Sequence, residues 1–407
     1  MQTFDGKSNR LTFSVLLFLS AWIVTSCDET PIVGGDFSPD DVIVNADTIK
    51  ISNLKLASSP SFSGNLSYVT TGAVNDPVFG EIRTTALLRP GIVRAAQVDT
   101  IGENPSARLT LDISNRYGST AIPAVYNIVE LGRPWRSTSW RYDSIPDLAK
   151  NPDLSDKVIG QFTLTEDDSI SVRLSDDWAI RYREIFLMPV SSERDSLYRF
   201  DMPGLAIVPA PGTDMMFSVQ PSRSRLVISS GDGLRDLSKE MNSWAVSMER
   251  KETVPLAQGS SKPVFNTMTS MLEIDIDLSK EFLGTTNFSR VEMVIYDDTL
   301  GMQQGTPPDY VRPRSETIRI FLLEPDQLFY SISADPRFQA NRREEDSSYR
   351  IPLTSFANER LRSGASTRKF YAITGGNDGR ILPALLSGPD DPHRQPKLLI
   401  TSISRQQ

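Results

Sequence analysis

Apolar and polar residues alternate with a period of two along many short segments of this chain. The alternation is clearest at residues 42–44, 107–113, 169–174, 225–228, 271–278, 317–323 and 397–403. A period of two places successive side chains on opposite faces of a β-strand. Turn-forming residues separate these segments at positions 75–77, 231–233, 307–308 and 375–379. Short strands between Gly- and Pro-rich turns predict an all-β, antiparallel architecture.

Helical patterning is scarce. The spacing predicts short helices over residues 176–184 and 355–362, with a further candidate at 237–246. Strand, strand, strand plus helix, strand and strand then recur in the same order in the two halves, at an offset of roughly 165 to 195 residues. We therefore expect two jelly-roll-like antiparallel β-sandwich domains with a few short helices, one over residues 41–230 and the other over 231–407.

The N-terminus carries an export pattern. Lys7 and Arg10 precede an apolar run at residues 11–24, and Thr25 and Ser26 follow it, directly before Cys27. A basic start, a short apolar middle and small residues before the cut are typical of a secretory signal peptide. The run is shorter than the roughly 20 residues that a membrane-spanning helix needs.

The segment at residues 24–27 resembles a bacterial lipobox. The resemblance implies a signal peptide over residues 1–26, cleavage before Cys27 and acylation of that cysteine, for example with palmitate. Residues 28–40 would form a flexible tether, because they mix acids, Gly and Pro with few apolar anchors. The alternative is an ordinary signal peptide with a cysteine beside it by chance.

Composition narrows the function classes. The chain has 51 acidic and 43 basic residues and a net charge of −8, which disfavours nucleic acid as a partner. Acyl chains, rather than charge, would hold the protein at a membrane. Cys27 is the only cysteine and His393 the only histidine, so we predict no disulfide, no metal site, no cofactor and no catalytic triad. His393 lies in a Pro-rich loop and is expected to be a solvated turn residue.

Adjacent acidic residues leave one catalytic route open, since glycoside hydrolysis needs only two carboxylates. Three roles compete for these residues: turns and helix caps, which we favour, calcium coordination and catalysis. The pairs or runs are Asp40–Asp41, Asp167–Asp168, Asp176–Asp177, Asp297–Asp298, Glu344–Asp346 and Asp390–Asp391.

An aromatic cluster is the main candidate for ligand binding. The segment GRPWRSTSWRY places Trp135, Trp140 and Tyr142 beside Arg136 and Arg141 in an expected loop. Exposed rings flanked by arginines suit a sugar-binding or protein-binding face. The alternative is that a ring closes the end of the sandwich core. Trp178 and Tyr182 have the helical i, i+4 spacing of core residues.

A short motif of Asp, then Ser or Thr, then an aliphatic residue recurs along the chain. It resembles the O-glycosylation sequence of exported Bacteroidetes proteins, and strand-entry patterning could equally produce it. The candidate positions are Thr48, Thr100, Ser144, Ser169, Ser196 and Thr299.

Several stretches together resemble a Bacteroidetes lipoprotein family classified as a domain of unknown function. They include GGDFSPDDVIV, AVNDPVFGEIRTTALL, ARLTLDISNRYGSTAIPAVYNIVEL, RFDMPGLAIVP and the terminal QPKLLITSI. The C-terminal half also resembles jelly-roll modules of bacterial surface proteins, some of which bind carbohydrate. The acidic pair Asp28–Glu29 resembles the surface-export signal of Bacteroidetes lipoproteins.

The sequence thus predicts a non-enzymatic lipoprotein, anchored in the outer membrane through its acyl chains, with the cell surface favoured over the periplasmic face. We expect it to bind or scaffold, as an accessory subunit of an outer-membrane protein complex. The alternatives are a module that binds a surface glycan and a carboxylate-dependent glycoside hydrolase.

Overall fold

A computed structural model of the chain describes residues 42–91, 104–148, 158–229, 236–251, 261–276, 287–322, 337–363 and 369–405. Cys27, the signal peptide and the tether lie outside these residues, as do Thr100 and the expected domain boundary near Gly231. Within the described part of the chain, no helix is both long enough and apolar enough to span a membrane.

The first of two structural units, which we call the first module, is an 11-stranded sheet. Its main path runs β12-β11-β5-β10-β3-β4-β9-β6-β7, with β8 and β16 paired to β5. β12 also pairs β4, so the sheet folds back on itself around a core. The strands are β3 (Val69–Asp76), β4 (Gly80–Pro90), β5 (Ser106–Ser119), β6 (Val125–Glu130), β7 (Val158–Thr163), β8 (Ser169–Arg173), β9 (Leu205–Pro209), β10 (Met215–Val219), β11 (Arg225–Ser229), β12 (Asp236–Lys251) and β16 (Tyr310–Val311).

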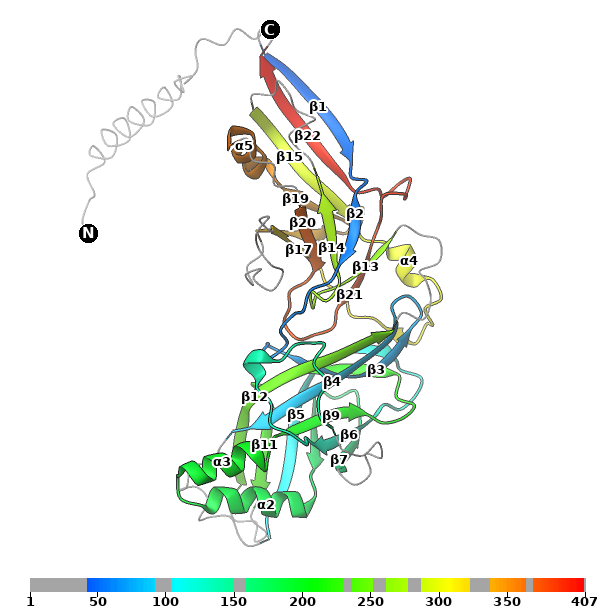
Figure 1. The fold of residues 1–407 in the computed structure, drawn as a ribbon. Coiled ribbons are helices and arrows are strands. Elements are labelled where there is room, and N and C mark those ends of the chain that lie inside the picture. The colour runs from blue at the N-terminus through cyan, green and yellow to red at the C-terminus, as the bar shows by residue number, and fades with distance from the viewer. Residues whose placement is uncertain are drawn as a thin grey trace, which may run out of the picture.

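The second module is a 9-stranded sheet in the order β1-β22-β15-β19-β18-β17-β20-β14-β2, together with the two-stranded sheet β13-β21. It lies at the other end of the molecule (Figure 1). Its strands are β1 (Val42–Lys50), β2 (Leu54–Ala57), β13 (Lys262–Phe265), β14 (Met271–Asp275), β15 (Asn287–Tyr296), β17 (Thr317–Leu322), β18 (Phe338–Arg343), β19 (Ser348–Pro352), β20 (Lys369–Thr374), β21 (Pro383–Leu386) and β22 (Lys397–Arg405).

The all-β, antiparallel sandwich class predicted from the sequence is confirmed, and every strand pairing in the described residues is antiparallel. Alternation explains strands such as β5, whose side chains at Ala107, Leu109 and Leu111 are fully buried between less buried neighbours. β9 and β10 are instead buried along their whole length. Neither strand shows a polar alternation in its sequence, because each of them is covered on its two faces.

Two of the three predicted helices are present in the structure. Those expected at 176–184 and 355–362 are α2 (Asp176–Leu187) and α5 (Thr354–Ser363), whereas residues 237–246 lie within β12, so the third prediction is wrong. Its residues pair with β11 and β4, and these tertiary hydrogen bonds override a marginal local helical pattern. Two further helices, α3 (Ser192–Phe200) and the short α4 (Thr299–Gln303), were not predicted from the sequence.

Sheet membership differs from the expected division at residues 230 and 231 in three places. The two-residue strand β16 lies in the second half of the sequence but pairs with β5 of the first module. β1 and β2 precede the first module in sequence but pair with β22 and β14 of the second. β12 follows residue 231 but pairs with β11 and β4 of the first. A linear boundary cannot describe this arrangement, because cross-strand hydrogen bonds join segments far apart in the chain.

The repeat suggested by the sequence recurs in the strand pairings. The five matched strands are β5, β6, β8, β9 and β11 in the first module, and β15, β17, β19, β20 and β22 in the second. In both modules the first matched strand pairs the third and the fifth, and the second pairs the fourth. A short helix follows the third matched strand each time. Identical pairing in identical order supports duplication more strongly than local pattern does.

A buried ion pair holds the residue that follows β16 against the end of β3. Asp76, at the end of β3, accepts hydrogen bonds from Arg312 Nε and Nη2, both at 2.9 Å, and from the Tyr117 hydroxyl at 2.7 Å. The side chains of Asp76 and Arg312 are 0% and 8% exposed. Burial and the charge of Asp76 raise the pKa of Tyr117 well above its usual value, so this phenol stays protonated and donates. The carboxylate also accepts from the backbone N–H groups of Val78 and Phe79.

Gly379 marks a close approach between the modules. Its φ is +95°, and an added Cβ would lie 1.8 Å from the Tyr68 carbonyl oxygen. We expect Gly379→Ala to lower the free energy of unfolding by more than about 1 kcal/mol. Gly212→Ala is the matched control, because Gly212 has a φ of +84° but no neighbour within 4 Å of an added Cβ. Urea unfolding should show a larger loss for Gly379→Ala, and equal losses would contradict the steric argument.

Candidate binding groove

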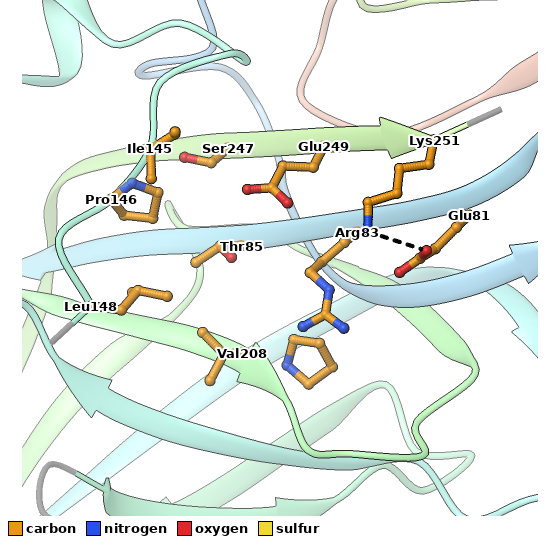
Figure 2. A pocket seen from close by; sticks show the side chains of 11 residues that line it. Glu81, Arg83, Thr85, Ile145, Pro146, Leu148, Val208, Ser247, Glu249 and Lys251 are labelled. Atoms are coloured by element: carbon orange, nitrogen blue, oxygen red, sulfur yellow. Dashed lines mark ion pairs between the residues drawn. The ribbon is translucent and has the colours of Figure 1, made fainter. Parts of the chain in front are cut away.

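A groove of about 370 Å³ lies on the outer face of the first module (Figure 2). Strands β4, β9 and β12 form its floor, and the loop that follows the 3₁₀ turn Ser137–Ser139 forms one wall. The lining residues are Glu81, Arg83, Thr85, Ile145, Pro146, Leu148, Val208, Pro209, Ser247, Glu249 and Lys251.

Strand register sets the floor of the groove. Glu81, Arg83 and Thr85 of β4 lie directly opposite Lys251, Glu249 and Ser247 of β12. The intervening residues of β4, such as Ile82, point to the opposite face and pack in the core. A row of three cross-strand polar pairs therefore follows from two alternating strands in one register.

The charges on the floor are only partly paired. Lys251 Nζ lies 3.6 Å from Glu81 Oε2, whereas the side chains of Arg83 and Glu249 make no hydrogen bond or ion pair with the part of the chain that the structure describes. Both of these side chains are exposed. An exposed guanidinium and an exposed carboxylate side by side can take a ligand that carries charges of both signs.

The wall of the groove is apolar and firmly held. Ile145 is 80% exposed, and Pro146 and Leu148 lie beside it. The backbone around the wall is tied down by hydrogen bonds from Met248 N to Tyr142 O (2.7 Å) and from Gly132 N to Asp147 O (2.8 Å). Ile145, Pro146 and Leu148 together give the groove one apolar side.

The aromatic cluster predicted as a ligand-binding face is mostly buried. Trp135 is 7% exposed and donates from Nε1 to Pro203 O at 2.8 Å, while Tyr142 is 1% exposed and its hydroxyl donates to Asn377 Oδ1 at 2.8 Å. Trp135 and Tyr142 were expected to be exposed, and that expectation is wrong. The loop folds over the outer face of β4, β6, β9 and β12 and packs Trp135 into a small apolar cluster there.

Trp140 is half-buried and donates from Nε1 to Ser247 Oγ at 3.1 Å. Ser247 itself lines the groove, so Trp140 lies beside the row of polar pairs on the floor. Its ring packs edge-on against Trp135, with centroids 5.8 Å apart. Arg136 and Arg141 are exposed, and Arg141 pairs with Asp143 at 3.0 Å. The arginines therefore do not converge with three rings on one ligand. The structure favours the alternative of a ring that belongs to the core, because Tyr142 is buried in the main core and Trp135 in the smaller apolar cluster.

The remaining predicted positions are dispersed. Among the glycosylation candidates, Thr48, Ser169 and Ser196 are exposed, and Ser144 and Thr299 are half-buried. His393 is exposed, and its backbone N–H donates to Asp391 Oδ1 at 2.9 Å, as expected for a turn. Asp298 caps α4 by accepting from Gly301 N, while Ser175, rather than Asp176, caps α2. In the described residues, no group of three or more His, Cys, Asp or Glu is placed to hold a metal ion.

Sequence reasoning missed the groove because its residues are spread over residues 81–251 and only strand register unites them. Two of its strands were within the family-like stretches, and alternation in AVNDPVFGEIRTTALL placed Glu81, Arg83 and Thr85 on one face. Nothing local indicated that β12 would lie beside β4.

Comparisons with known proteins give no family. No protein-family model matches the chain, and no curated protein matches it. Among solved structures, the chain is similar to one of Red clover necrotic mosaic virus, with 9% identity, 88% of this chain and 97% of that chain covered, and a TM-score of 0.16. A Parabacteroides distasonis protein described as secreted shows 10% identity, 90% and 89% coverage and a TM-score of 0.17. A Macrobrachium rosenbergii nodavirus structure shows 10% identity, 93% and 94% coverage and a TM-score of 0.10.

Proposed function

We propose that this chain is a lipid-anchored protein of the outer-membrane surface that binds or scaffolds a partner and catalyses no reaction. The anchor rests on the sequence, in which Cys27 directly follows an export segment and a lipobox-like run. The binding role rests on one structural observation, the groove with its unpaired Arg83 and Glu249 beside the exposed Ile145. The partner would be a subunit of an outer-membrane protein complex.

The fold would hold this groove away from the membrane. β1 begins at the end of the second module that points away from the first (Figure 1), and Val42 pairs with Arg405 there. The residues between Cys27 and Val42 can span at most about 50 Å when fully extended. The second module would therefore lie next to the lipid, and the first module would present its groove to a partner.

The groove fits an extended polypeptide segment with mixed character. A carboxylate of the segment would meet Arg83, a basic group would meet Glu249, and an aliphatic side chain would pack on Ile145. Charge-assisted pairs of this kind give specificity, and a desolvated aliphatic anchor gives affinity. Anchoring in the same membrane raises the effective concentration of such a partner.

Mild-detergent capture of the native lipoprotein, followed by mass spectrometry, tests the proposal. We expect Arg83→Glu to lower capture of a specific outer-membrane protein at least tenfold, which corresponds to about 1.4 kcal/mol. The double variant Arg83→Glu/Glu249→Arg reverses the pair and should not restore capture, because the partner's charges are unchanged.

Val190→Glu is the matched control, since Val190 is 71% exposed, lies between α2 and α3 and does not line the groove. Equal capture by the groove variants and the control would contradict the proposal. Binding to a glycan array that Trp140→Ala abolishes would favour the carbohydrate-binding alternative instead.

A further inference from the structure

The strand correspondence between the modules extends beyond the five strands that the sequence matched. β3 pairs β10 as β13 pairs β21, β4 pairs β9 as β14 pairs β20, and β6 pairs β7 as β17 pairs β18. Nine strands of the first module thus have a counterpart in the second, in the same chain order. In that order, β3 to β11 correspond to β13, β14, β15, β17, β18, β19, β20, β21 and β22.

Apart from the two-residue strand β16, one element of each module has no counterpart at the same place in the chain order. β12 completes the first module: residues 236–240 pair with β11, and residues 241–251 then cross to β4. In the second module the counterparts of β11 and β4 are β22 and β14, and they are completed by β1 and β2, respectively. Only Ile51, Ser52 and Asn53 separate β1 from β2. The segment 42–57 therefore occupies in the second module the place that β12 occupies in the first.

Each of these segments lies directly before a module in sequence but completes the other module in space. β12 precedes β13, the first counterpart strand of the second module, and the segment 42–57 precedes β3. The pattern is that of a duplicated unit whose copies have exchanged their first strand within one chain. Exchange of an identical element between equivalent units is the defining feature of domain swapping.

The segment 42–57 occupies the edges of β22 and β14, and we call these two edges the seat of the segment. We propose that this seat also accepts the segment 42–57 of a second copy of this chain. The seat already takes a strand that does not adjoin its own module in sequence, and a second copy offers the same residues. All nine cross-strand pairs between β1 and β22, from Val42–Arg405 to Lys50–Lys397, would form unchanged between copies.

The covalent connection permits this exchange without loss of strand pairing. The first module and the segment 42–57 of each copy would pack on the second module of the other copy. The Asp76–Arg312 pair and the close approach at Gly379 would then form between copies. The two halves of the exchange would be joined by residues 252–260, which connect β12 to β13 and lie outside the described residues. Such a segment can reach about 35 Å.

Position 44 gives a direct readout, because Val44 lies opposite Ile403 in the register and is 63% exposed. In full mature chains carrying Cys27→Ser, one population would carry Val44→Cys and the other Ile403→Cys. After the two are mixed, unfolded, refolded together at high concentration and oxidised, we expect a disulfide-linked heterodimer. The yield of this heterodimer should be at least tenfold higher than the yield from a mixture of Val44→Cys with Ile122→Cys. Ile122 is exposed and lies between β5 and β6 of the first module.

Two further outcomes keep the result unambiguous. The double variant Val44→Cys/Ile403→Cys should close an internal disulfide when refolded at high dilution, which shows that the pair is competent. A heterodimer yield no higher than that of the Ile122→Cys control would overturn the proposal. Failure of the internal disulfide would overturn it as well, because β1 would then not occupy this seat.

Discussion

Arg312→Ala is expected to lower the free energy of unfolding by about 3–5 kcal/mol, the usual cost of removing one partner from a buried ion pair. The variant leaves the Asp76 carboxylate fully buried without its guanidinium. It also removes the cation that lies over the rings of Phe79 and Tyr310, at 5.6 and 5.4 Å from their centroids. Urea unfolding monitored by tryptophan fluorescence measures the loss.

Arg108→Ala is the matched control. Arg108 and Asp236 form an ion pair at 3.5 Å whose side chains are 50% and 57% exposed. Surface pairs of this kind contribute about 0–1 kcal/mol. Arg312→Lys should give an intermediate loss, because lysine keeps the charge but cannot donate the two parallel hydrogen bonds that Asp76 receives. A loss for Arg312→Ala no larger than that for Arg108→Ala would refute the role of the buried pair.

Cys27→Ser is expected to abolish lipid attachment. The thiol that would carry the acyl chain is the only one in the chain, so no other residue can replace it. Metabolic labelling with palmitate should fall to background, and the protein should move from the membrane fraction to the soluble fraction. Label retained by Cys27→Ser would contradict the anchor.

The double variant Asp28→Asn/Glu29→Gln separates anchoring from location. It should keep the palmitate label, because the cysteine is intact. If the acidic pair directs export to the surface, the variant should become protected from protease added to intact cells, while the parent chain is cleaved. Equal cleavage of both would show that Asp28 and Glu29 do not set the location.

The sequence determined the secondary structure wherever the local pattern and the final environment agree. Alternation identified β5, β8, β17 and β22 because each has one face in a core and the other less buried. The helix at α2 was predictable because Trp178 and Tyr182 have i, i+4 spacing, and their rings do stack, with centroids 5.0 Å apart. The order of strands and helices also revealed the repeat, because the two halves share the order of their elements although their residues differ.

Only the tertiary structure decided which strands lie together. β1 and β2 cross to the second module and β12 to the first, because hydrogen-bond partners for an edge strand can come from any part of the chain. The same non-local pairing opposes Arg83 to Glu249 and so creates the groove. It also buries Trp135 and Tyr142, since burial depends on what a loop folds over and not on the residues within it. Asp76 and Arg312 are 236 positions apart, and only the tertiary structure, in which β16 pairs with β5, brings them into contact.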